Sequence, residues 1–207
     1  MEILYMLEKI RVPVLNELML AITTLGEETA FLALALIFFW CIDKRRGYLL
    51  MAVGFSGTIL NQFMKLWFRV PRPWVRDPNF TIVESARADA TGYSFPSGHS
   101  QNAVCTFGSL ACITKDRWVK WVSIAIAVLV PFSRMYVGVH TPADVLVGGG
   151  MALALVLLLK PVSLKDDPKL MKILVAAMMA LAVGLLLYVE LWTFPADIDI
   201  HNLDSGM

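Results

Sequence analysis

The chain has 207 residues, enough for one domain or two small ones. Apolar residues make up 57% of it and charged residues 17%, against about 45–50% and about 25% in an ordinary soluble protein, which indicates a membrane protein. With 18 Lys and Arg against 17 Asp and Glu, the net charge of +1 leaves no basic surplus, which argues against a nucleic-acid partner. The three cysteines lack metal-ligand and disulfide spacing, so we expect no zinc site and no disulfide framework.

The N-terminal segment has the pattern of an amphipathic helix. Apolar residues recur at helical spacing, as at Leu7, Ile10 and Val14, with charged and amide residues between them. Residues 1–24 are therefore predicted to form a helix that lies at the membrane interface. A secretory signal is excluded because Glu2 and later charges interrupt what would be its apolar core.

Six apolar stretches follow, each close to the roughly 20 residues that a helix needs to cross a bilayer. They are residues 28–42, 47–68, 100–114, 118–138, 142–159 and 173–193. The third is short and partly polar, and it is included because its neighbours require the chain to recross the membrane. The sequence predicts one all-α domain over residues 1–207, a polytopic membrane bundle of about six transmembrane helices plus the N-terminal amphipathic helix.

One connection, residues 69–98, is much longer than the others. Loops of this length are usually functional or disordered, and its prolines, aromatic residues and charges favour an ordered lid. Basic residues concentrate in the connections at 44–46, 115–120 and 160–172, which places these in the cytoplasm. The long loop and both termini are then predicted to be extracytoplasmic. The short chain and the six spans suit a protein of a bacterial plasma membrane.

Three cations are predicted to meet on the extracytoplasmic side. Lys65 and Arg72 lie at and just after the end of the second apolar stretch, and Arg134 lies near the end of the fourth. Unpaired cations near lipid are costly unless an anion compensates them, and guanidinium groups match the oxygens of a phosphate. Ser97 and Gly98 add a hydroxyl and backbone N–H groups, so these five residues form the predicted phosphate-binding set.

Two histidines lie beside these cations in the predicted topology. Asp144 follows His140 by four residues, so that a helix beginning at Thr141-Pro142 brings the carboxylate to one ring nitrogen of His140. Such a contact fixes the tautomer and raises the basicity of the other nitrogen. We therefore assign His140 as the nucleophile, His99 as the general acid and Asp144 as the orienting acid, with no metal and no cofactor.

These residues stand in an ordered pattern that resembles a known family. The pattern is Lys65-x6-Arg72-Pro73, then Pro96-Ser97-Gly98-His99, then Ser133-Arg134-x5-His140-x3-Asp144. It is similar to the three signature motifs of the type 2 phosphatidic acid phosphatase superfamily, and all eleven positions match. The resemblance implies a metal-independent reaction through a phosphohistidine on His140, in which His99 protonates the departing oxygen and water then resolves the intermediate.

The leading hypothesis is thus an integral-membrane phosphatase that removes the terminal phosphate of a lipid phosphate or diphosphate. Candidate substrates are undecaprenyl diphosphate, phosphatidic acid and phosphatidylglycerol phosphate. The superfamily also contains vanadate-dependent haloperoxidases, but these are soluble, which argues against halide oxidation. A second alternative is a non-catalytic protein that binds or transports phospholipids. The preferred lipid, the oligomeric state and whether the chain is a truncated form of a longer protein stay open.

Taken singly, the same residues have structural explanations. Lys65 and Arg72 are typical of basic side chains that reach from the end of a span toward the membrane surface. Ser97 is a favoured residue at a helix N-terminus. The three consecutive glycines at 148–150 are more typical of close helix packing than of a ligand site.

Overall fold

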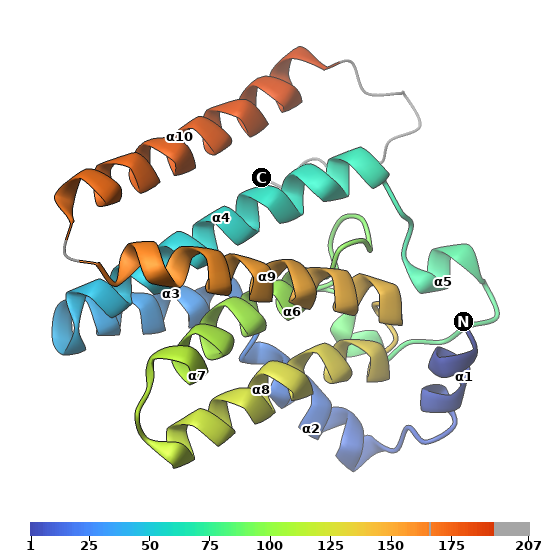
Figure 1. Ribbon diagram of the computed structural model, residues 1–207. Helices are drawn as coiled ribbons and strands as arrows, with labels where there is room; N and C mark the ends of the chain where they lie inside the picture. The colour runs from blue at the N-terminus through green and yellow to red at the C-terminus, as the bar shows by residue number, and fades with distance from the viewer. Residues whose placement is uncertain (166, 193–207) are drawn as a thin grey trace.

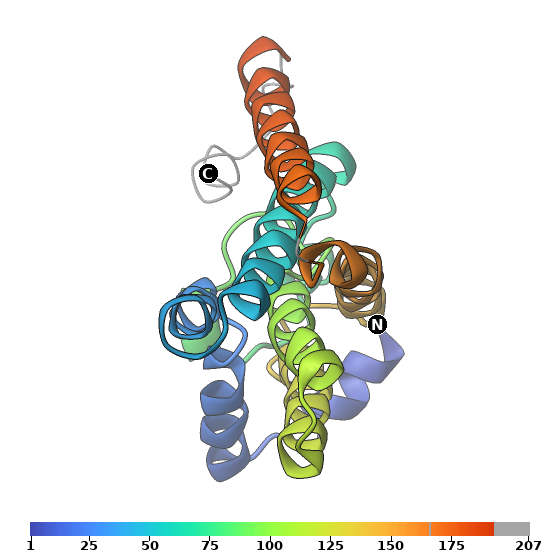
Figure 2. The same cartoon turned by 60° about the vertical axis from the view of Figure 1, so that its left-hand side comes forward.

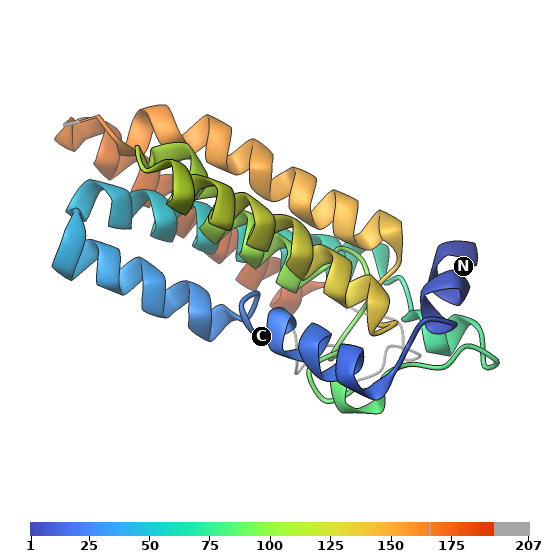
Figure 3. The same ribbon diagram turned by 90° about the horizontal axis from the view of Figure 1, so that it is seen from below.

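The computed structural model describes residues 1–165 and 167–192, and all regular secondary structure in these residues is helical. Figure 1 shows the chain as a bundle of long helices joined by short connections and one long loop, and Figure 3 shows that α3, α4, α8 and α9 run along a common direction. The elements are α1 (Glu2–Glu8), α2 (Pro13–Thr24), α3 (Glu28–Ile37), η1 (Phe38–Ile42), α4 (Lys44–Phe68), α5 (Pro73–Arg76), η2 (Glu84–Ala86), α6 (Gly98–Ala103), η3 (Val104–Gly108), α7 (Ser109–Ile113), α8 (Arg117–Tyr136), α9 (Pro142–Ser163) and α10 (Pro168–Leu191).

The N-terminal segment consists of two helices and not of the single helix predicted over residues 1–24. Helix α1 ends at Glu8, and α2 begins at Pro13 after an extended Val12 with φ −134° and ψ 151°. Proline disfavours helical geometry in the residue before it, which explains the break. Helix α2 packs against α8, and its location at the membrane interface stays a prediction.

The predicted apolar stretches coincide with helices, but a count of six spans is not confirmed. Four segments of the described chain are long and apolar enough to cross a membrane, namely the segment that begins with α4 and the helices α8, α9 and α10. A fifth span results if α2 and α3, which meet at a 47° bend, are taken together. The segment α6–η3–α7, predicted as the third span, is shorter and contains buried polar side chains, among them Gln101, Thr106 and Ser109. These face protein and not lipid, so low hydropathy does not prevent burial.

Helix α6 lies at the centre of the bundle, where it packs against α4, α8 and α9. Its contact with α9 depends on Gly148, because a Cβ atom at this position would lie 2.5 Å from the carbonyl oxygen of Ser97. A Cβ atom at Gly150, two residues later on the same helix, would meet no atom within 4 Å. Of the three consecutive glycines, Gly148 is therefore the one that close helix packing requires.

Replacing Gly148 with alanine is expected to lower the melting temperature of the purified protein in detergent. The added methyl group forces the backbone around Ser97 to shift, and overpacking of this kind costs about 1–3 kcal/mol. Gly150→Ala is the matched control, because it adds the same methyl group to the same helix without a contact, and alanine is favoured over glycine in a helix. Equal melting temperatures for the two variants would contradict the assignment.

The N-terminus is fastened to the long loop. The Tyr5 hydroxyl donates to Asp77 Oδ2 at 2.7 Å, and the Thr81 hydroxyl and amide both donate to Glu8 Oε1. Arg11 donates to the carbonyl oxygen of Thr81 at 2.7 Å and to that of Tyr136 at 2.8 Å. Helix α1 and the segment after it therefore join the loop to the end of α8.

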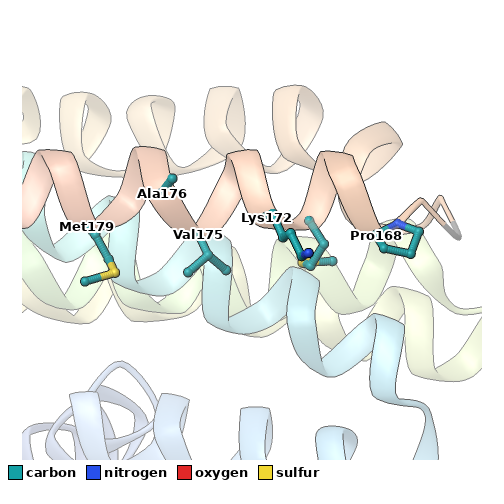
Figure 4. Close-up of a pocket in the computed structure, with 6 residues that line it drawn as sticks. Pro168, Lys172, Val175, Ala176 and Met179 are labelled. Carbon is teal, nitrogen blue, oxygen red and sulfur yellow. The ribbon is translucent and has the colours of Figure 1, made fainter.

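Helix α10 lies at the edge of the bundle, as Figure 2 shows, and most of its residues are exposed. Its C-terminal end meets α4 through ring contacts of Tyr188 with Phe63 and Trp67. A hollow of about 440 Å³ runs along its N-terminal half, and the six residues that line it all belong to α10 (Figure 4). The predicted span 173–193 coincides with most of α10, and its last residue lies outside the described residues.

Candidate active site

The predicted site residues come from distant parts of the chain that the fold brings together. Lys65 lies in the last turn of α4, Arg134 in the last turn of α8, and His140 in the turn between α8 and α9. They share one pocket of about 350 Å³ at the end of the bundle where the long loop lies. The pocket is lined by Gly26, Glu27, Glu28, Thr29, Gln62, Lys65, Arg72, Asp89, Thr91, Gly98, His99, Asn102, Arg134 and His140.

Arg134 is completely buried, and none of its three guanidinium nitrogens has a hydrogen-bond partner within the described chain. Nε2 of His99 is likewise buried and unpartnered. Buried donors left without an acceptor cost about 1–3 kcal/mol each, more when charged, so such groups are normally paired in proteins. Four unpaired nitrogens on one pocket are therefore suited to a ligand rich in acceptor oxygens.

Arg72, near the start of the long loop, is held by residues near the end of that loop. Its Nε donates to the carbonyl oxygen of Gly92 at 3.0 Å, and Nη2 donates to that of Thr91 at 2.5 Å. Nη1 donates to the carbonyl oxygen of Val139 at 3.1 Å and lies 2.9 Å from Nε2 of His140. These contacts place a cation against the pocket face of the imidazole and fix the loop over it.

His140 lies next to a buried carboxylate, at the position that its spacing from Asp144 predicted. Nδ1 of His140 lies 3.6 Å from Oδ2 of Asp144, and each residue is 2% exposed. The same Oδ2 atom accepts from the Thr141 amide at 2.7 Å and from the Ser94 hydroxyl at 2.5 Å, while the Thr141 hydroxyl caps α9. With a protonated Nδ1 toward Asp144, Nε2 is free to accept from Arg72.

The ring of His140 is kept neutral by its surroundings. Burial is the largest influence, and the nearby charges of Arg72, Arg134 and Lys65 act in the same direction, so that the pKa of His140 lies well below its usual value. An uncharged imidazole retains a lone pair at neutral pH. The geometry thus provides a nucleophilic nitrogen that faces the unpaired donors of the pocket.

Ser97 and Gly98 occupy different positions relative to the pocket. The Ser97 side chain is fully buried behind it and caps α6, because its Oγ accepts from the amide of Ser100 at 3.3 Å and from the Ser100 hydroxyl at 2.9 Å. This is the structural explanation that its sequence context also allowed. Gly98 and His99, the first residues of α6, line the pocket itself.

Several residues that line the pocket or contact its side chains escaped the sequence analysis. Ser94 donates to Asp144 from two residues before the second motif, where no spacing rule marks it. Glu27 and Glu28, at the start of α3, line the pocket, as does Asp89 from the long loop. Within the described residues, no group of three or more His, Cys, Asp or Glu side chains is arranged to hold a metal ion.

Comparisons with known proteins find a matching family model and similar proteins. The model of the PAP2 superfamily matches residues 46–168. Phosphatidylglycerophosphatase B of Bacillus subtilis strain 168 is 35% identical over 164 residues, which cover 73% of this chain and 76% of that protein. Undecaprenyl-diphosphatase BcrC of the same strain is 32% identical over 146 residues, which cover 70% of this chain and 72% of that protein.

Solved structures show the same fold. The crystal structure of a transmembrane PAP2 type phosphatidylglycerolphosphate phosphatase from Bacillus subtilis has a TM-score of 0.65 at 33% identity, and the match covers 81% of this chain and 85% of that chain. The crystal structure of LpxE from Aquifex aeolicus has a TM-score of 0.64 at 23% identity, over 76% of this chain and 92% of that chain. The second likeness concerns the fold alone.

Proposed function

Because the chain belongs to the PAP2 superfamily, we propose that it removes the terminal phosphate of a membrane lipid through a phosphohistidine intermediate and without a metal ion. Its similar proteins are lipid phosphatases, and its helices are apolar enough to lie in a membrane. The observation that carries the mechanism is the set of buried, unpaired nitrogens of Arg134 and His99 beside a neutral His140.

Substrate binding is the first step of the proposed mechanism. The phosphate oxygens accept hydrogen bonds from Arg134, with further positive charge from Lys65 and Arg72 and a backbone N–H of Gly98. Nη1 of Arg72 leaves Nε2 of His140 and turns to a phosphate oxygen, which frees the nucleophile. Ser97 contributes indirectly, since it caps the short helix that presents Gly98 and His99.

Phosphoryl transfer follows in two steps. Burial and the nearby cations lower the pKa of His99 in the free protein, and the bound phosphate dianion offsets these cations, so that His99 takes up a proton with the substrate. Nε2 of His140 forms a bond to phosphorus while the bond to the lipid oxygen breaks, and protonated His99 gives its proton to that oxygen. Asp144 stabilises the positive charge that develops on the ring. His99, now neutral, then accepts a proton from a water molecule that attacks phosphorus, so that the N–P bond breaks and inorganic phosphate leaves.

The proposed substrates are phosphatidic acid, phosphatidylglycerol phosphate and undecaprenyl diphosphate, approached from the extracytoplasmic side. The asymmetry of basic residues between the two ends of the bundle supports this orientation. The similar proteins include both a phosphatidylglycerophosphatase and an undecaprenyl-diphosphatase, which supports both classes of substrate.

The proposal is tested by phosphate release from the purified protein in detergent that contains EDTA. We expect release from at least one of the three lipids, no loss of rate with the chelator, and inhibition by orthovanadate, which resembles the five-coordinate phosphorus. A soluble aryl phosphate serves as the comparison for selectivity. If a verifiably folded protein releases no phosphate from any substrate, the non-catalytic alternative is favoured. If phosphate release is lost in EDTA and restored by a divalent ion, the metal-independent mechanism is contradicted.

A further inference from the structure

A second cavity, larger than the catalytic pocket, runs along the outer side of the bundle. Its volume is about 840 Å³, within the range of pockets that bind small molecules, and it shares no lining residue with the catalytic pocket. One face of α8 and one face of α9 form its walls, and η3 and α7 form its floor. The lining residues are Val104, Gly108, Ala111, Cys112, Thr114, Lys120, Ile124, Ala127, Val128, Pro131, Phe132, Met135, Val145, Leu146, Gly149, Gly150, Leu153 and Lys160.

Glycines keep this groove open where packing does not require them. Gly148, which α9 needs for its contact with Ser97, does not line the groove. Gly150 does, and a Cβ atom there would meet nothing within 4 Å. At Gly149 a Cβ atom would lie 3.4 Å from the Val104 side chain, at the edge of ordinary van der Waals contact. The absence of side chains at Gly149 and Gly150 therefore leaves space in the groove for a bound ligand.

The groove has a charged end. Lys120 near the start of α8 and Lys160 near the end of α9 line it at the end farthest from the catalytic pocket. Neither ammonium group has an ion pair or hydrogen bond with any residue in 1–165 or 167–192. Apart from Thr114 the remaining lining is apolar. From Lys120 to Met135 the α8 wall is about 22 Å long at 1.5 Å per residue, which is comparable to most of the 30 Å hydrocarbon core of a bilayer.

We propose that this groove binds an anionic phospholipid, with an acyl chain along α8 and α9 and the headgroup against Lys120 and Lys160. Lining side chains such as Val128 and Leu146 are exposed, so the groove faces the hydrocarbon core of the bilayer. The apolar groups available there are lipid acyl chains. Lysine side chains reach from the end of an apolar helix to the level of lipid headgroups. The two unpaired ammonium groups complement a negative headgroup, and the groove supplies the matching apolar surface.

This site differs from the catalytic one in chemistry as well as place. Its bound lipid is not hydrolysed, because the groove offers no histidine and no guanidinium group among its lining residues. The lipid enters from the membrane surface opposite the catalytic pocket. The inference does not depend on the proposed phosphatase reaction and is tested by lipid binding alone.

The test is native mass spectrometry of the detergent-purified protein with added phosphatidylserine or phosphatidylcholine of identical acyl chains. Phosphatidylserine is chosen because it is an anionic phosphodiester and neither a substrate nor a product of the proposed reaction. We expect phosphatidylserine to bind the wild-type protein at least about tenfold more tightly than phosphatidylcholine, since each lysine near an anionic headgroup is worth about fivefold in affinity. Equal binding of the two lipids would overturn the proposal.

Variants assign the binding to the groove. The double variant Lys120→Gln/Lys160→Gln should lose most of the preference for phosphatidylserine. Lys115→Gln/Lys165→Gln is the matched control, because it removes two exposed lysines from the same end of the bundle that do not line the groove. Gly150→Leu fills the groove without a backbone clash and should weaken the binding of both lipids. A preference that survives in the first variant, or that falls equally in the control, would contradict the assignment.

A native cysteine reports where the lipid lies. Cys112 lines the groove, whereas Cys41 is exposed on η1 and does not. Phosphatidylserine should slow maleimide labelling of Cys112 several-fold and leave Cys41 unchanged, as measured by peptide mass spectrometry. Protection of Cys112 by a non-hydrolysable lipid phosphonate that persists in Lys120→Gln/Lys160→Gln would instead assign the groove to the chain of the substrate, and would refute an anionic lipid site.

Discussion

The variant His140→Ala is expected to lose phosphate release by at least about a thousandfold in kcat, in line with the loss of a nucleophile in other enzymes. In the proposed mechanism Nε2 of His140 is the atom that forms the bond to phosphorus, so the variant lacks the nucleophile of the first step. The measurement is phosphate release at saturating substrate, together with acid-labile labelling of the protein by a ³²P-labelled lipid, which should disappear in the variant. Turnover close to that of the wild type would refute the phosphohistidine mechanism.

His99→Asn is the control that separates the two histidines. A general acid matters when the leaving group is a poor one such as a lipid alkoxide, and far less for an aryl phosphate whose phenolate leaves without a proton. We therefore expect His99→Asn to lose much more activity on lipid phosphates than on p-nitrophenyl phosphate, whereas His140→Ala loses both. Melting temperatures of both variants show whether the fold is retained, since His140 is buried.

The second large effect is expected at Arg134. Arg134→Gln should lower kcat/KM by about 10²- to 10³-fold, because it removes charged donors from the position where negative charge develops. Arg134→Lys keeps the charge but loses the planar fork of the guanidinium, so an intermediate loss is expected. Arg76→Lys, at an exposed arginine of α5 that does not line the pocket, should behave like the wild-type protein.

A thermal-shift measurement with orthovanadate makes the Arg134 prediction independent of turnover. In the wild-type protein the oxyanion pairs the buried guanidinium and should raise the melting temperature, since a ligand that binds only the folded state stabilises it. In Arg134→Gln this shift should largely disappear. A shift of the same size in both proteins would mean that Arg134 does not contact the bound anion.

The positions of the long helices could be predicted from the sequence because their apolar runs are much longer than those of surface loops. The proximity of His140 and Asp144 could be predicted because four residues make about one helical turn. It could not predict the span count, since α6–η3–α7 is buried by its neighbours and does not need an apolar composition. The helical spacing of apolar residues over 1–24 did not indicate the break before Pro13, where α2 begins.

Contacts between distant segments were not predictable. Ser94 reaches Asp144 across 50 residues, and Arg72 is bound by carbonyl oxygens of the long loop, so neither contact leaves a local pattern. The role of Ser97 illustrates a different limit: a serine before a short helix is equally suited to a ligand and to a cap, and only its burial behind the pocket distinguishes the two.

The attachment of α1 to the long loop has a practical consequence for anyone who engineers this chain. Tyr5 and Glu8 bind the segment from Asp77 to Thr81 of the long loop. A purification tag or fluorescent protein fused ahead of Met1 therefore disturbs the same loop that binds Arg72. An affinity tag inserted between α7 and α8, at residues 115–116, lies at the opposite end of the bundle. Fusions at the first position should slow turnover, and insertions at the second should leave it unchanged.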